Sequence, residues 1–169
     1  MNPSKKKGIE RELPHTHIYL VVLPLVFFII WFLDSSIFNF STILNNYIPL
    51  ILRVVLFGLL TIIALIIIYI SHQTLFHSHE PPDHLIMTGI FQYIRNPMYS
   101  GILLLYIAMV CLSISLLGIL VLILSYLVFN KMVNFEENIL ESDFGEEYLK
   151  YKQIVPKWIP NPFKKLNLK

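Results

Sequence analysis

The sequence has few charged residues, few glycines and a single cysteine, and these shortages exclude several classes of protein. Charged side chains make up 14% of the 169 residues and hydrophobic ones 56%, and the mean hydropathy is +0.65, far from the usage of soluble domains. The net charge of +2 is too small to indicate a nucleic acid partner. Cys111 stands alone in an apolar run, which excludes an internal disulfide. The composition therefore predicts an integral membrane protein.

Two long apolar runs lie in the first eighty residues. The first, 18–33, follows a basic segment at 5–11, which is also the pattern of a signal peptide. The residues after it lack a small-x-small cleavage site, so we expect a retained span followed by a loop over 34–46 without Lys or Arg. The second run, 47–70, is expected to cross as well, with Arg53 snorkelling toward the loop.

A third apolar run extends from Tyr99 to Phe129. As one helix it would measure about 46 Å, too long for one crossing and short for two. Arg95 before it and Lys131 after it favour the same, cytoplasmic side, so a tight two-helix hairpin is expected. Its turn should lie near one of three small residues, Ser113, Ser115 or Gly118. The sequence predicts an all-α integral membrane protein with about four transmembrane helices and both termini cytoplasmic.

A polar, aromatic and glycine-marked segment, 88–101, interrupts the apolar pattern. Asn96 is a good N-cap and Pro97 suits the first helical position, so a helix should begin there. Its free N–H groups, with Arg95 beside them, form a receptor for a carboxylate or a phosphate. The competing interpretation is the ordinary interfacial start of a membrane helix.

A histidine-rich segment, 71–84, permits a metal-site interpretation. The spacing of His77 and His79 does not suit one helical face, and no pair of these histidines has the i, i+4 geometry of a helical zinc site. A hydrated loop stiffened by Pro81 and Pro82 is the better interpretation, and no metal site is predicted.

Glu136 and Glu137 directly follow the last apolar run. Two carboxylates at the negative end of a helix are unfavourable, so either the helix continues or a ligand or cation compensates them. Beyond them, Phe144 to Val155 carries apolar residues at helical spacing with charged residues between. This predicts a cytoplasmic amphipathic helix near the C-terminus, which lies in the interface or caps the bundle.

Two ordered motifs flank the expected hairpin. The first reads Pro81-Pro82-x-x-Leu85-Ile86-x-Thr88-Gly89-Ile90-Phe91-x-Tyr93-Ile94-Arg95-Asn96-Pro97-Met98-Tyr99-x-Gly101. The second reads Glu136-Glu137-x-x-Leu140-x-x-x-Phe144-Gly145-x-x-Tyr148-x-x-Tyr151-x-x-x-Val155-Pro156. Together they resemble the isoprenylcysteine carboxyl methyltransferase and phospholipid methyltransferase superfamily, in its bacterial type with Arg-Asn-Pro-Met-Tyr. The resemblance covers roughly residues 81–160.

The resemblance implies an S-adenosyl-L-methionine-dependent methyltransferase whose cytoplasmic cofactor pocket is closed over by the C-terminal segment. It divides the chain into an N-terminal membrane region, 1–80, with two transmembrane helices, and a methyltransferase core, 81–169. It implies catalytic roles for Arg95, Asn96 and Glu136. The implied cofactor contacts are His84, Leu85, Ile86, Met87, Phe91, Asn96, Pro97, Met98, Tyr99, Glu136 and Glu137.

The chemistry of the cofactor agrees with these residue types. Apolar residues such as Leu85 and Phe91 suit adenine, and the helix start beside Arg95 suits the carboxylate. Glu136 would pair with the ammonium or face the sulfonium. Met132 stands where the family has a substrate-side arginine, which separates this chain from the prenylcysteine-specific pattern.

The resulting prediction is a membrane methyltransferase that acts on a lipid-like or membrane-partitioning small molecule, with membrane lipids as partners. No obvious general base lies near the motif, which favours a carboxylate or thiolate acceptor over a protonated amine. One alternative is a phospholipid N-methyltransferase. The other is a non-catalytic membrane or metal-handling protein that uses His77, His79 and His84.

Overall fold

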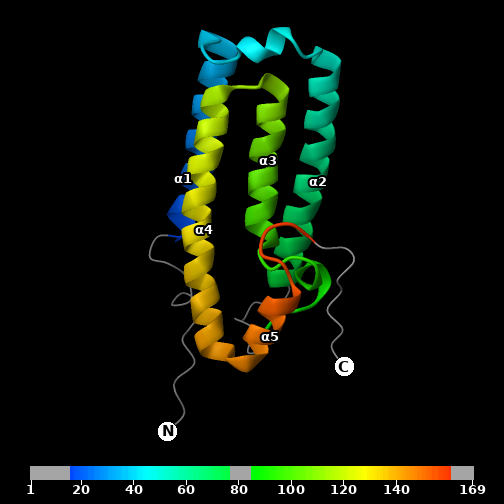
Figure 1. Ribbon diagram of the computed structural model, residues 1–169, viewed down its shortest axis with the longest axis vertical. Helices are drawn as coiled ribbons and strands as arrows, with labels where there is room; N and C mark the ends of the chain where they lie inside the picture. Colours follow the sequence, from blue (N-terminus) through cyan, green and yellow to red (C-terminus); the bar gives the residue numbers. More distant parts are fainter. Residues whose placement is uncertain (1–15, 77–84, 161–169) are drawn as a thin grey trace. The chain divides into compact units, whose positions relative to one another are not determined.

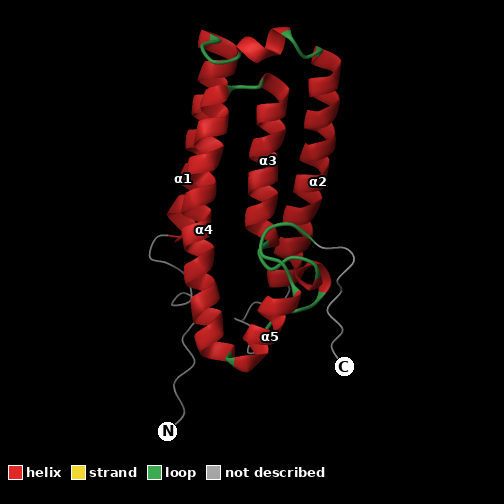
Figure 2. Ribbon diagram, viewed as in Figure 1, coloured by secondary structure: helices red, strands yellow, loops and turns green. Residues whose placement is uncertain are grey.

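The computed structural model describes residues 16–76 and 85–160, and the regular structure in these ranges is entirely helical (Figure 2). Five α-helices follow one another along the chain (Figure 1): α1 (Thr16–Phe32), α2 (Leu50–Phe76), α3 (Pro97–Ser113), α4 (Leu116–Phe144) and α5 (Glu146–Ile154). Shorter helical segments are a π-helical one at Leu33–Phe38 and 3-10 turns at Ile43–Asn46 and Gly89–Gln92.

Membrane-spanning character is clear for three of these segments. Ile18–Phe38, Leu50–Leu75 and Leu116–Phe144 are long and apolar enough to cross a bilayer, and α3 is a shorter apolar helix of 17 residues. At about 1.5 Å per residue α3 measures about 25 Å, slightly less than a hydrocarbon core. Large apolar side chains such as Ile51 and Val21 remain exposed on these helices, as expected for surfaces that face lipid. The prediction of an all-α integral membrane protein is confirmed.

The predicted hairpin is formed by α3 and α4. Helix α3 ends at Ser113 and α4 begins at Leu116, so the turn lies among the small residues that the sequence indicated. Ile114, at the turn, has φ 42°, a left-handed conformation that is strained for a β-branched residue. Such a conformation persists only where the surrounding structure holds it in place.

Hydrogen bonds to Asp34 provide that support. Its carboxylate is 2% exposed and accepts the backbone N–H of Ser41 at 2.9 Å and the hydroxyls of Ser41 and Ser115 at 2.5 Å each. The expectation that Asp34 begins a loop was wrong, because it lies inside the π-helical segment that extends the first span. The three donors compensate the cost of burying its charge.

The second span begins and ends later than expected, at Leu50 and Phe76. Arg53 does reach toward the loop, since its Nη1 donates to Asn45 Oδ1 at 2.7 Å. The same nitrogen donates to the Leu112 carbonyl at 2.9 Å, so the arginine also satisfies a carbonyl at the C-terminal end of α3.

The described chain forms two compact units. The apolar unit comprises 17–66 and 101–129, and the polar unit comprises Thr16, 67–76, 85–100 and 130–160. The sequence-based division at residue 80 concerns function and stays a prediction.

The polar unit has its own small core around α5. Leu85, Tyr148, Tyr151 and Val155 are buried together, and the following residues pack against them: Met87, Leu140, Phe144 and Ile154. Gly145, with φ 52° and ψ −124°, reverses the chain after α4, so that α5 folds back (Figure 1). The amphipathic helix expected from the sequence is therefore present, and its cytoplasmic location stays a prediction.

Candidate functional site

The first motif forms a 3-10 turn followed by the start of α3. Gly89 has φ 59°, and a Cβ there would meet the Thr74 side chain at 3.3 Å, so the turn requires glycine. Helix α3 begins at Pro97, as the sequence indicated, and the Asn96 carbonyl accepts the N–H and the hydroxyl of Ser100 at 3.1 and 3.0 Å. Pro97 itself is fully buried. The residue types of the motif are thus explained by local backbone geometry.

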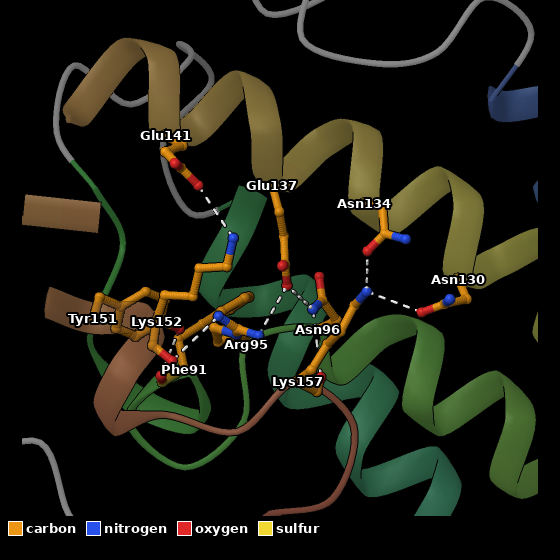
Figure 3. Close-up of polar contacts among 10 residues, drawn as sticks. All are labelled: Phe91, Arg95, Asn96, Asn130, Asn134, Glu137, Glu141, Tyr151, Lys152 and Lys157. Atoms are coloured by element: carbon orange, nitrogen blue, oxygen red, sulfur yellow. Dashed lines mark hydrogen bonds and ion pairs between the residues drawn. The ribbon is translucent and has the colours of Figure 1, made fainter. Parts of the chain in front are cut away.

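A buried ion pair joins this helix start to α4. Arg95 Nη2 lies 3.4 Å from Glu137 Oε1, and Asn96 Nδ2 donates to the same oxygen at 3.0 Å (Figure 3). The side chains of Arg95 and Glu137 are only 9% and 6% exposed. Helix α4 runs on through both glutamates to Phe144, which confirms the first of the two explanations offered for them. Glu137 is therefore the carboxylate that the Arg-Asn pair holds.

Glu136 has a different partner. Tyr99, 8% exposed, donates its hydroxyl to Glu136 Oε1 at 2.5 Å, and Glu136 itself is only half-buried. Adjacent residues on a helix point in directions about 100° apart, which separates the roles of the two carboxylates. The Glu136 carboxylate is the more accessible of the pair.

The segment 156–158, here called the strap, covers the start of α3. Three of its carbonyl groups accept hydrogen bonds, from the Arg95 N–H at 2.9 Å, from Asn96 Nδ2 at 3.4 Å and from the Ser100 hydroxyl at 3.0 Å. The helix start that the sequence presents as an anion receptor is thus covered by the chain's own residues.

Four polar residues of α4 form one stripe, here called the polar stripe: Asn130, Asn134, Glu137 and Glu141. Lys157 Nζ donates to Asn130 Oδ1 at 2.9 Å and to Asn134 Oδ1 at 2.5 Å, and Lys152 Nζ pairs with Glu141 at 3.1 Å (Figure 3). Sequence reasoning missed the asparagines and both lysines. The signal was available, because residues at i, i+4, i+7 and i+11 of a helix share one face, and all four of these are polar.

Most residues assigned to the adenine pack against other parts of the polar unit. Leu85 and Met87 belong to or contact the core around α5, and the buried Phe91 offers its carbonyl to the Tyr151 hydroxyl at 2.8 Å. Ile86 and Met98 are half-buried.

The structure does not test the predictions for the histidines. His84, with His77 and His79, lies outside the described residues. Residues 16–76 and 85–160 hold no group of three His, Cys, Asp or Glu side chains arranged for a metal ion.

Burial changes the acidity of three side chains of the polar unit. It raises the pKa of the Tyr148 and Tyr151 phenols above the ordinary value of 10.0. It lowers the pKa of the Lys157 ammonium below 10.5, while the nearby Glu137 carboxylate acts in the opposite direction. The tyrosines therefore stay protonated at neutral pH and serve as donors and core residues.

Comparison with known proteins agrees with the motif geometry. The family model for phospholipid methyltransferases matches residues 48–147, which include Arg95, Asn96 and both glutamates. The protein-S-isoprenylcysteine O-methyltransferase B of Arabidopsis thaliana is 32% identical over 84 residues, which cover 48% of this chain and 42% of that protein. The match thus covers less than half of the relative's length. More than half of this chain lies within the family model, and the chain belongs to the phospholipid methyltransferase family.

Proposed function

We propose that this protein is an integral membrane methyltransferase that takes its methyl group from S-adenosyl-L-methionine and gives it to a lipid-like or membrane-partitioning small molecule. The observation that carries the proposal is the meeting of the two motifs, since Asn96 contacts Glu137 and Tyr99 contacts Glu136 across 41 and 37 residues of sequence. Family membership supports methyl transfer, and the apolar spans support an acceptor that reaches the protein from the bilayer.

The charged groups of the polar unit fit the two ends of this methyl donor. Arginine has five N–H donors. The contacts of the Arg95 guanidinium within the described residues are long, 3.4 Å to the Lys152 carbonyl and 3.4 Å to Glu137, and its buried Nε has no partner there. Leaving such a donor buried and unpaired is costly, so Arg95 has capacity for a ligand carboxylate. The half-buried Glu136 supplies negative charge for a cationic centre.

S-adenosyl-L-methionine, when bound, supplies an electrophilic methyl group on a sulfonium centre. The protein's part is to bind, to align and to exclude water. We assign carboxylate binding to Arg95 and Asn96, and charge stabilisation to Glu136, which Tyr99 orients through its hydroxyl. Helix α5 contacts the first motif, because Tyr151 donates its hydroxyl to the Phe91 carbonyl. Arg95 also donates to the Lys152 carbonyl of α5, so this helix would keep water out.

The acceptor is proposed to be an oxygen or sulfur nucleophile that is already anionic. Tyr148 and Tyr151 stay protonated because burial raises the pKa of each, so they do not remove a proton from an amine. Glu137 is engaged by Arg95 and Asn96. The name of the Arabidopsis relative refers to O-methylation, which supports a carboxylate acceptor here.

Calorimetric titration of S-adenosyl-L-methionine into purified protein in nanodiscs tests the proposal. The unaltered protein should bind, and Tyr99→Phe should weaken binding about threefold to tenfold, because Glu136 loses one hydrogen bond that orients it. The matched control is Glu141→Gln, which changes a 39% exposed side chain paired with Lys152 and should bind normally. Absence of binding by the unaltered protein would refute the proposal.

Identification of the acceptor follows from a second experiment. Membrane extracts incubated with the protein and methyl-labelled donor should yield a labelled, base-labile ester if the acceptor is a carboxylate. A labelled aminophospholipid would instead establish the N-methyltransferase alternative.

A further inference from the structure

The side chain of Lys157 occupies a receptor made of neutral groups. Its Nζ lies 2.9 Å from Asn130 Oδ1 and 2.5 Å from Asn134 Oδ1 (Figure 3). The same nitrogen lies 5.6 Å from the centre of the Trp158 ring. A primary ammonium has three donors, and two amide oxygens with an aromatic face nearby suit it well. The two asparagines are one helical turn apart on α4, so their spacing is fixed by the helix.

A lysine that served only to hold the strap would be better paired with a carboxylate. The neighbouring Lys152 shows this arrangement, because its Nζ pairs with Glu141 at 3.1 Å on the same stripe. Lys157 instead has neutral partners, and burial lowers the pKa of its ammonium. The receptor thus binds an ammonium without neutralising it.

A carboxylate is held in a similar way next to this receptor. Arg95 and Asn96 hold Glu137, and Asn96 Nδ2 also donates to the Lys157 carbonyl at 3.4 Å. One carboxylate and one ammonium of the protein are therefore held close together on one face of α4, and Asn96 contacts Glu137 and the backbone of Lys157. An α-amino acid end, with its carboxylate and its ammonium, has the same pair of charges.

We propose that Asn130 and Asn134 form the receptor for a primary ammonium group of a ligand, and that Lys157 fills it until the ligand displaces it and the strap opens. The inference rests on the proposed function, because the amino-acid end of the methyl donor is one source of such an ammonium. The headgroup of an aminophospholipid is the other source. Neither asparagine belongs to the two sequence motifs, 81–101 and 136–156, that carry the family resemblance.

Binding of two nucleosides to variants in nanodiscs tests the receptor. S-adenosylhomocysteine carries the amino-acid end, whereas 5′-methylthioadenosine lacks it. Lys157→Met should tighten binding of S-adenosylhomocysteine about threefold to tenfold, because the internal competitor is gone, and Asn134→Leu should weaken it by a similar factor. Neither substitution should change the affinity for 5′-methylthioadenosine. Lys152→Met is the matched control and should leave both affinities unchanged.

A lysine that merely holds the strap gives the opposite result. Lys157→Met would then weaken the binding of both nucleosides, and this outcome would overturn the inference. The inference would also fail by itself if the unaltered protein bound S-adenosylhomocysteine, Lys157→Met and Asn134→Leu changed nothing, and phosphatidylethanolamine did not speed trypsin cleavage after Lys157. If the unaltered protein bound neither nucleoside, the proposed function would fail instead.

Trypsin cleavage after Lys157, followed by mass spectrometry, reports on the strap without any methyl transfer. In phosphatidylcholine nanodiscs, S-adenosylhomocysteine should speed this cleavage several-fold, and 5′-methylthioadenosine should not. Faster cleavage in nanodiscs that contain phosphatidylethanolamine, with no nucleoside added, would support the receptor and assign its ammonium to the lipid headgroup. Cleavage that neither ammonium source accelerates would overturn the proposal.

Discussion

Replacing Glu137 with alanine will leave the Arg95 guanidinium buried without a carboxylate partner. The two side chains are 9% and 6% exposed, so solvent screens their interaction very little. Removing one partner of a buried pair costs about 3–5 kcal/mol, mostly because the remaining charge is uncompensated. The N–O separation of 3.4 Å is long for an ion pair, whereas Glu137→Ala also removes the 3.0 Å hydrogen bond from Asn96. We therefore expect a loss of about 3 kcal/mol in the free energy of unfolding.

Titration with sodium dodecyl sulfate, followed by circular dichroism, measures that free energy for a helical membrane protein. The control is Glu141→Ala, which removes a carboxylate one turn later whose side chain is 39% exposed. An exposed pair of this kind contributes about 0–1 kcal/mol, so the control should unfold almost like the unaltered protein.

A second substitution separates charge from packing. The double variant Arg95→Met with Glu137→Met removes both charges, so it should recover much of the stability that Glu137→Ala loses. The reasoning is refuted if Glu137→Ala costs no more than Glu141→Ala. It is also refuted if the double variant is destabilised by the sum of the two single substitutions.

Three further perturbations have defined outcomes. Asp34→Ala removes an acceptor of three hydrogen bonds and should lower the free energy of unfolding by about 2–4 kcal/mol in the same titration. Gly145→Ala has open space for its methyl group but places alanine at φ 52°, so thermal unfolding should show a loss of about 1–3 kcal/mol from backbone strain alone. Burial raises the pKa of Tyr148 and Tyr151, so their stabilising contribution is complete below the unfolded pKa of 10.0 and is lost as the pH rises from there toward the folded pKa values. As the pH rises, absorbance of tyrosinate at 295 nm should therefore increase together with unfolding. In a Tyr148→Phe, Tyr151→Phe variant, both the increase in absorbance and the loss of stability should be smaller. The lowered pKa of Lys157 acts with the opposite sign, which makes that comparison necessary.

The features that the sequence predicted well depend on local or additive signals. Apolar length identified the spans, and the length of the 99–129 run together with the positions of Arg95 and Lys131 required a hairpin. Pro97 marked the start of α3 because proline suits the first helical position. Two carboxylates at the negative end of a helix are unfavourable, which made continuation one of the two explanations for Glu136 and Glu137. Helix α4 does continue beyond them, to Phe144.

The features that the sequence did not predict depend on which side chains meet across many residues of chain. Two adjacent glutamates look alike in sequence, yet the rotation of α4 directs Glu137 to Arg95 and leaves Glu136 to Tyr99. The burial of Asp34 depends on a hydroxyl 81 residues away, at Ser115. Such pairings are set by packing, which periodicity alone does not specify. The roles of these residues in methyl transfer stay predictions.

The polar stripe of α4 has a consequence for the evolution of the chain. Its members contact the strap, the start of α3 and α5 from one face of a helix that turns about 100° per residue. Inserting or deleting one residue between Asn134 and Glu137 would rotate Glu137 and Glu141 away from their partners. Every partner residue would still be present in the sequence. Natural homologues that keep these contacts should therefore vary in the identity of residue 135 but not in the number of residues between Asn134 and Glu137. Length variation is expected instead in connections such as the one between α2 and the Gly89–Gln92 turn.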